Sequence, residues 1–208
     1  MSETAPASPE RRIEAALLRI TAAIESSTTL DAPAAFARTA ADRLIASPRI
    51  SRLLRGAPLG HAAHPLLTDV PIGLWVSASA LDLLGPVHTR RAAQRLVGLG
   101  VLAAAPTVVT GLADWRASEP LDVRVRRVGV VHAASNASAT ALYATSWLAR
   151  RRGHHAAGVA LALAGATVAG VGGYLGGHLT LVRHAPLVGP HDDVPASPQA
   201  GTPVPPAT

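Results

Sequence analysis

The 208-residue sequence contains no cysteine. This absence excludes disulfides, thiolate zinc sites, cysteine-ligated iron–sulfur clusters and haem attached through thioether bonds. A metal or cofactor must therefore be held by other side chains. A chain without thiols fits either side of a membrane, so its redox compartment stays open.

Lysine is also absent, and all 19 basic residues are arginines. The formal net charge is +6, but the arginines lie in short groups between apolar segments. Such groups are typical of charges that flank membrane spans, whereas one basic stripe with interleaved aromatic residues would indicate nucleic-acid binding. We therefore expect the lipid bilayer as a partner, and no nucleic acid.

Charged residues make up only 15% of the chain, and hydrophobic residues make up 49%. This composition is too apolar for an ordinary soluble domain and predicts a membrane protein. The first ten residues lack the basic and then apolar run of a cleaved secretory signal. Insertion is therefore expected to depend on internal spans.

Four glycine-rich apolar segments are long enough to cross a bilayer as helices. They run from about Pro65 to Leu84, Ala92 to Trp115, Val128 to Leu148 and Ala156 to Val182. In the first segment, Pro71 removes a backbone donor and leaves the carbonyl of Leu67 without its helical partner, which predicts a kink.

The predicted fold is all-α, an integral membrane four-helix bundle over residues 59–184. Short amphipathic helices are expected over residues 1–58, where apolar residues recur at helical spacing and Ser47 with Pro48 form a helix start. We expect this region to pack on the bundle, the alternative being a helix that binds the membrane surface or a partner. The proline-rich tail, residues 185–208, cannot build a core and is expected to be disordered.

Ionisable residues stand at one end of each apolar segment. Because successive helices run in opposite directions, these residues are expected on one membrane face, in one shared pocket: His61, His64, Asp69, Asp114, His132 and His178. A polar group at membrane depth needs an internal partner, so the group is a functional-site hypothesis.

All six residues are candidate metal ligands, and His64, His132 and His178 are candidate ligands of a b-type haem or another cofactor. Structural interpretations stand beside these. A histidine at a span entrance caps the helix or forms a core hydrogen bond, a buried aspartate pairs with a base, and Asp114 beside Trp115 is typical of an interface anchor.

Three segments carry a family resemblance: GHAAHPLLTDVPIGLWVSASALDLLG from Gly60 to Gly85, GLADW from Gly111, and GGYLGGHLTLVRH from Gly172 to His184. Through these segments, residues 59–184 resemble the domain of unknown function 2231 family, a set of uncharacterised bacterial membrane proteins. The resemblance implies four spans and an uncharacterised activity. It also implies that His61, His64, Asp69, His132 and His178 match the family's polar positions.

Some members of that family are joined to Rieske-type or cytochrome-type redox modules. This sequence contains no Rieske domain, so the resemblance implies a separate redox protein as partner. The functions left open are a haem- or metal-binding redox module, a structural anchor or assembly protein, and a proton or ion relay. Whether the chain is an enzyme also stays open. We expect it in the plasma (inner) membrane with both termini in the cytoplasm, because the polar N-terminal region need not be exported.

Overall fold

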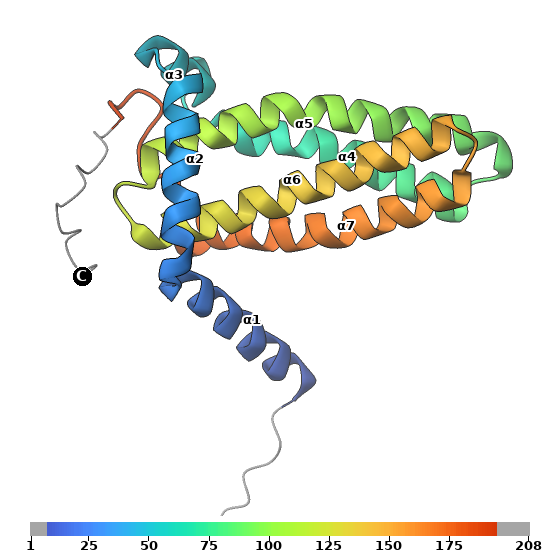
Figure 1. Ribbon diagram of the computed structural model, residues 1–208, viewed down its shortest axis with the longest axis horizontal. Helices are drawn as coiled ribbons and strands as arrows, with labels where there is room; N and C mark the ends of the chain where they lie inside the picture. Colours follow the sequence, from blue (N-terminus) through green and yellow to red (C-terminus); the bar gives the residue numbers. More distant parts are fainter. Residues whose placement is uncertain (1–7, 195–208) are drawn as a thin grey trace, which may run out of the picture.

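A computed structural model describes residues 8–194 and contains helices and turns, with no β-strand in that range (Figure 1). The all-α prediction is thereby confirmed for these residues. Three shorter helices precede four long ones, and short 3₁₀ turns join several of them. Residues 195–208, most of the tail expected to be disordered, lie outside the described range.

The N-terminal region forms α1 (Pro9–Ser26), α2 (Asp31–Leu44) and α3 (Pro48–Leu54). Local sequence explains where they start, because α1 and α3 each have serine before the helix and proline in its first turn. Gly56 follows α3 at a φ of +91°, and an added Cβ would meet the carbonyl oxygen of His61. Glycine therefore permits the sharp turn that leads to the long helices.

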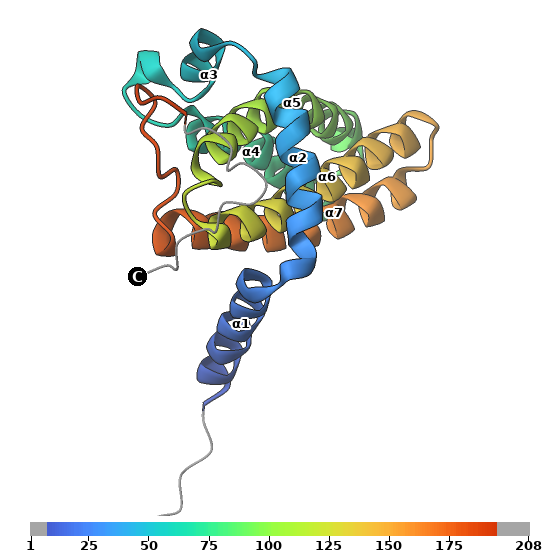
Figure 2. The same cartoon turned by 60° about the vertical axis from the view of Figure 1, so that its left-hand side comes forward.

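The long helices are α4 (Ala63–Leu84), α5 (Arg90–Ser118), α6 (Val123–Arg151) and α7 (His155–Gly177). The last of them continues through a π-helical turn over His178–Val182. They lie side by side and alternate in direction (Figures 1 and 2). The contacts pair α4 with α5, α5 with α6, α6 with α7, and α4 with α7, so α4 and α6 are diagonal neighbours.

Three helical segments are long and apolar enough to cross a bilayer: Ala63–Leu84, Val87–Ser118 and His155–Val182. The third expected span, in α6, does not reach this standard within the described residues. Its composition gives the reason, because the charge-free stretch of α6, residues 128–149, holds His132, Asn136 and several serines and threonines, which lower its mean hydropathy. The structure thus offers three candidate spans where the sequence pattern predicts four.

The proline in α4 leaves one backbone carbonyl of that helix without its helical donor. Pro71 lies inside the helix, and the carbonyl of Leu67 accepts a hydrogen bond of 3.1 Å from the Thr107 hydroxyl of α5. The polar group that proline leaves unpaired is therefore satisfied by the neighbouring helix. This contact also places Thr107 at the depth of Leu67, which fixes the register of α4 against α5.

An aromatic pair fills the interior of the long helices away from α2. Trp75 of α4 stacks on Tyr143 of α6 with ring centroids 4.0 Å apart, and its indole N–H donates to the carbonyl of Val97. Alanines and Val97 pack around this pair. The small residues let the helices approach closely, as in other helix pairs of membrane proteins.

One end of the long helices is crossed by α2, while α1 points away from the group at an angle (Figures 1 and 2). The helix α2 contacts α5 and α6, and α1 contacts α6. This end, called the capped end below, is where α4 and α6 begin and α5 and α7 finish. The N-terminal region thus contacts the long helices, but the apolar residues Ile13, Ile20 and Phe36 of its amphipathic pattern stay 62%, 54% and 78% exposed.

Candidate functional site

His64 and His132 meet between the diagonal helices α4 and α6, near the capped end. Their ring centroids are 6.4 Å apart, and the ring planes stand at 84° to each other. Both side chains are partly buried. Two of the three histidines that the sequence marks as cofactor ligands are therefore brought together.

Each of these imidazoles is oriented by a backbone carbonyl of a neighbouring helix. The Nδ1 of His64 lies 2.9 Å from the carbonyl oxygen of Thr107, and the Nδ1 of His132 lies 2.9 Å from that of Gly172. A carbonyl only accepts hydrogen bonds, so each Nδ1 must carry the proton and donate. In a neutral imidazole the lone pair is then on Nε2. For His64 this nitrogen is open to a metal or proton, whereas Nε2 of His132 lies within hydrogen-bond distance of the Asn136 amide, which a metal would have to displace.

Glycines allow the rings to lie against the helix backbones. A Cβ added at Gly111 of α5 would lie 2.7 Å from the His64 ring, and one at Gly176 of α7 would lie 3.0 Å from the His132 ring. The amide nitrogen of Asn136 lies 3.2 Å from Nε2 of His132 and donates to that residue's carbonyl. No partner of Nε2 in His64 is found within the described residues.

His178 belongs to a different cluster. Its Nε2 lies 2.6 Å from a carboxylate oxygen of Glu25 in α1, and Arg183 donates to both carboxylate oxygens of Glu25. Burial raises the pKa of Glu25, but the hydrogen bonds and charges of Arg183 and His178 outweigh it and leave the pKa below its ordinary value. This histidine therefore fastens α1 to the end of α7, and its Nε2 is already engaged.

Asp114 is buried near the end of α5. The positive charge of Arg55, which follows α3, interacts electrostatically with its carboxylate. Within residues 8–194 its carboxylate makes no hydrogen bond. Arg55 is almost fully buried and donates to the carbonyls of Gly189 and Asp192. Burial lowers the pKa of Arg55, while the charges of Asp114 and Asp192 raise it, and the net shift is downward.

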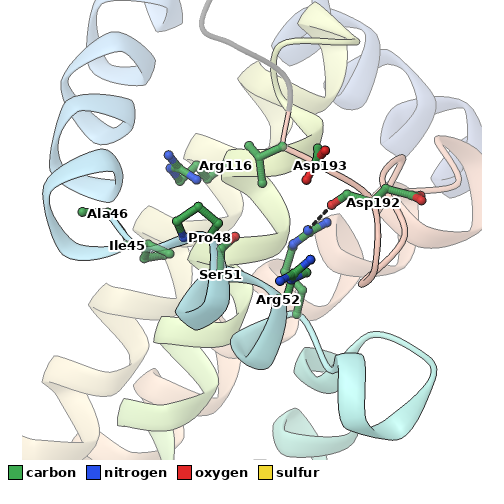
Figure 3. Close-up of a pocket in the computed structure, with 10 residues that line it drawn as sticks. Ile45, Ala46, Pro48, Ser51, Arg52, Arg116, Asp192 and Asp193 are labelled. Carbon is green, nitrogen blue, oxygen red and sulfur yellow. Dashed lines mark hydrogen bonds between the residues drawn. The ribbon is translucent and has the colours of Figure 1, made fainter.

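A cavity of about 260 Å³ opens beside Arg55, between α3, α5 and residues 192–194 (Figure 3). Arg52 and Arg116 line it together with Asp192 and Asp193, so its wall carries both signs of charge. The Oγ of Ser51 and the Nε of Arg55 are buried without a partner among the described residues. Part of the tail expected to be disordered, up to residue 194, lies against this region, and Leu187 donates its N–H to Ser118.

Asp69 and His61 lie away from the histidine pair. Asp69 is exposed on the outer side of α4, because five helical residues after His64 correspond to a turn of roughly 140° around the axis. His61 precedes α4, is exposed, and contacts only the neighbouring carbonyl of Ala62 at 3.0 Å. Counting residues along spans gives their depth but not the side of the helix that they occupy.

The prediction of one shared pocket is therefore wrong. Within residues 8–194, no three His, Asp or Glu side chains gather as a metal site would require. The candidate ligands divide into the His64–His132 pair, the His178 cluster on α1, and Asp114 near Arg55, while His61 and Asp69 face outward.

Sequence reasoning missed the ion pairs that join the N-terminal helices to the capped end. Arg38 of α2 bonds Glu119 at 2.7 Å, Arg116 bonds Asp42 at 2.6 Å, and Arg127 bonds both carboxylate oxygens of Asp31 at 2.8 Å. Their partners lie 74 to 96 residues apart in the chain. The available signal was the group of arginines near the start of α6 opposite scattered acids of the N-terminal region.

The fold and the apolar helices define an all-α membrane protein. A family model described as "Predicted membrane protein (DUF2231)" matches residues 60–186, and the chain belongs to this family. The match covers the four long helices and the π-helical turn. No curated protein and no solved structure gives a significant match to this chain.

Proposed function

We propose that this protein crosses the membrane four times and holds a haem b, or a non-haem metal, between His64 and His132. The observation that carries the proposal is the pairing of these two imidazoles, from diagonal helices, at 6.4 Å between ring centroids. Metal–imidazole bonds of about 2.0–2.1 Å would place two opposed rings roughly 6 Å apart.

The donor set favours haem over a bare ion. Structural and catalytic zinc sites use three or four protein ligands, whereas a haem iron needs only axial ligands from the protein. The described residues supply two imidazoles here and no third donor. The Nδ1 bonds to Thr107 and Gly172 are the kind of outer contact that orients metal-binding histidines.

The arginines near the site do not add to this proposal. Each arginine near the capped end that a haem propionate would need already pairs with a carboxylate of this chain: Arg124, Arg126, Arg127 and Arg183. The histidine pair therefore carries the proposal alone. A separate redox protein as electron partner stays a prediction from the family resemblance.

The fourth crossing is α6, and internal hydrogen bonds support it. Thr140 and Thr145 donate to carbonyls one turn back at 2.8 Å, and Ser146 donates to the carbonyl of Gly158 on α7 at 2.6 Å. Hydroxyls satisfied in this way cost less in lipid. Four crossings would place both termini on one side, which we infer to be the cytoplasmic side of the plasma membrane.

The test is an absorbance spectrum and metal analysis of the full-length protein in detergent, before and after titration with hemin. We expect a Soret band at one haem per chain, lost in His64→Ala and in His132→Ala. The control is His61→Ala, which changes an exposed histidine outside the pair and should keep the band. Stoichiometric metal without a Soret band would assign a non-haem metal to the pair, and a colourless, metal-free protein would overturn the proposal.

A structural anchor or assembly protein is the second candidate. The observation in its favour is that His178 and Arg183 at the end of α7 both bond Glu25 and so hold α1 against the long helices. If His64→Ala and His132→Ala lower the melting temperature of a colourless, metal-free protein, the pair is a hydrogen-bonded brace and this second function replaces the first.

A further inference from the structure

Asp69 occupies an unusual position for an acid in a candidate span. It lies in Ala63–Leu84, its side chain faces outward, and it has no hydrogen bond or ion pair within residues 8–194. Ionisable residues in membrane helices almost always face the bundle interior or a partner. The other acid of α4, Asp82, follows that rule and bonds Arg150 inside the helix group.

The depth of Asp69 follows from the register of α4 against α5. Thr107 bonds the carbonyl of Leu67, so Asp69 lies near the depth of Thr107. From Thr107, α5 continues without a charged residue as far as Asp114, seven residues or about 10 Å further. Asp69 is therefore inside the uncharged band of the helices, beyond easy reach of the headgroup region for a side chain as short as aspartate.

The surface around Asp69 suits contact with another helix. Its neighbours on the outward side of α4 are Leu66, Val70 and Val76, which are 55%, 50% and 63% exposed. Gly73 lies one turn after Asp69, and an added Cβ there would meet no atom within 4 Å. A glycine in an apolar face allows another helix to approach closely in lipid.

Charge decides between the possible occupants of this face. Residues 1–7 and 195–208 contain no lysine, arginine or histidine, so they bring no basic side chain to Asp69. A two-fold pairing of α4 with a second copy would place two Asp69 carboxylates at the same depth, where like charges repel. A basic side chain from a different protein would form an ion pair with the Asp69 carboxylate.

We propose that the outward face of α4, formed by Leu66, Asp69, Val70, Gly73 and Val76, docks a transmembrane helix of another protein that carries an arginine or lysine at the depth of Asp69. This interaction is independent of the histidine pair, because Asp69 lies on the opposite side of α4. The docked helix would give Asp69 a partner inside the membrane and would pack closely against Gly73.

The experiment uses cross-linking in phosphatidylcholine vesicles. The chain has no cysteine, so Gly73→Cys supplies a single thiol on the proposed face. The probe is a leucine–alanine transmembrane peptide with one cysteine and one arginine placed about 10 Å from its end. An otherwise identical peptide with leucine in place of the arginine is the reference.

We expect the arginine peptide to cross-link about five- to thirtyfold more than the leucine peptide, the range of one interhelical polar contact in model peptides. Adding Asp69→Asn should remove this preference, and Asp69→Glu should keep it. Gly170→Cys is the matched control, since Gly170 of α7 also borders open space.

Three results would overturn the proposal. Equal cross-linking of both peptides would leave Asp69 facing lipid. The same preference at Gly170→Cys would make the effect non-specific. Cross-linking of Gly73→Cys chains to one another in preference to the arginine peptide would assign the face to a second copy. None of these results depends on whether the histidine pair binds a cofactor.

Discussion

The two halves of the long-helix group use glycine in the same way but surround different side chains. In the half near α2, His64 lies against Gly111 of α5, and its Nδ1 donates to the carbonyl of Thr107. In the other half, Trp75 lies against Gly100 of the same helix, and its indole N–H donates to the carbonyl of Val97. An indole has then used its one polar group, whereas an imidazole keeps a second nitrogen. The same packing therefore yields a core in one half and a candidate ligand site in the other.

The two ends differ in how they hold charge. At the capped end, several ion pairs, from the buried Arg38–Glu119 pair to the more exposed Arg127–Asp31 pair, connect α1 and α2 to the ends of α5, α6 and α7. At the far end, Arg150 and Asp82 form a bidentate pair whose side chains are each 1% exposed. Breaking one buried pair leaves an uncompensated charge, while a network shares the loss. Loss of one charged side chain should thus lower the free energy of unfolding more at the far end than at the capped end.

The largest effect is expected for Asp82→Asn at the far end. The substitution keeps the size of the side chain but leaves the Arg150 guanidinium buried without an opposite charge, which should cost about 3–5 kcal/mol. Thermal unfolding in detergent measures this loss. The double variant Asp82→Leu with Arg150→Met should recover most of it, because two apolar residues replace the pair. Wild-type stability in Asp82→Asn would contradict the contrast between the two ends.

Gly100→Ala should have the next largest effect, in the aromatic half. The added methyl group would overlap the Trp75 indole, which is fixed by its stacking on Tyr143, so we expect a loss of about 1–3 kcal/mol. Chemical unfolding followed by tryptophan fluorescence measures it. The control Gly170→Ala meets no neighbouring atom and should stabilise the helix by about 0.4–1 kcal/mol. Equal effects of the two substitutions would show that the ring contact on α5 is not tight.

Glu119→Gln tests the distributed charge of the capped end. One carboxylate oxygen of Glu119 accepts from Arg38 and the other accepts from Arg126, so glutamine leaves one arginine facing an amide donor. We expect a loss of about 1–2 kcal/mol in the docking of α2, with the long helices intact. Faster trypsin cleavage after the exposed Arg43 measures it. Arg124→Gln, at a more exposed pair, is the control and should change cleavage little.

Much of the fold could be predicted from the sequence because its signals are local. Serine followed by proline predicts the start of α3 at Pro48, and the missing amide of Pro71 predicts the free carbonyl at Leu67. Alternation of helix direction predicts that His64 and His132 share a depth. These inferences need only the covalent structure and the rise of a helix.

What could not be predicted depends on rotation and on distant partners. The facing of Asp69 depends on how α4 is turned about its axis, which its nearly uniform apolar composition does not specify. The partner of His178 is Glu25, 153 residues earlier in the chain. Arg90 and Arg91 are the arginines nearest to Asp82 in the chain, but Asp82 bonds Arg150 of α6. Nearness in sequence is a poor guide to ion pairs between helices.

The smallest effect is expected when the pH is lowered, because protonation of Glu25 weakens the docking of α1 at the capped end. Its pKa in the folded protein is below the ordinary value of 4.5, because Arg183 and His178 favour the carboxylate more strongly than burial opposes it. A lowered pKa contributes stability that is complete above the ordinary value and is lost as the pH falls through the folded value. The contact between α1 and α7 should therefore hold at neutral pH and weaken below about pH 4.5, the ordinary value. Hydrogen exchange of α1 between pH 6 and pH 3, corrected for the intrinsic rate, measures this weakening. Glu25→Gln should show the weakened state already at pH 6 and little further change with acid, whereas acid sensitivity equal to that of the wild type would mean that another group holds α1 in place.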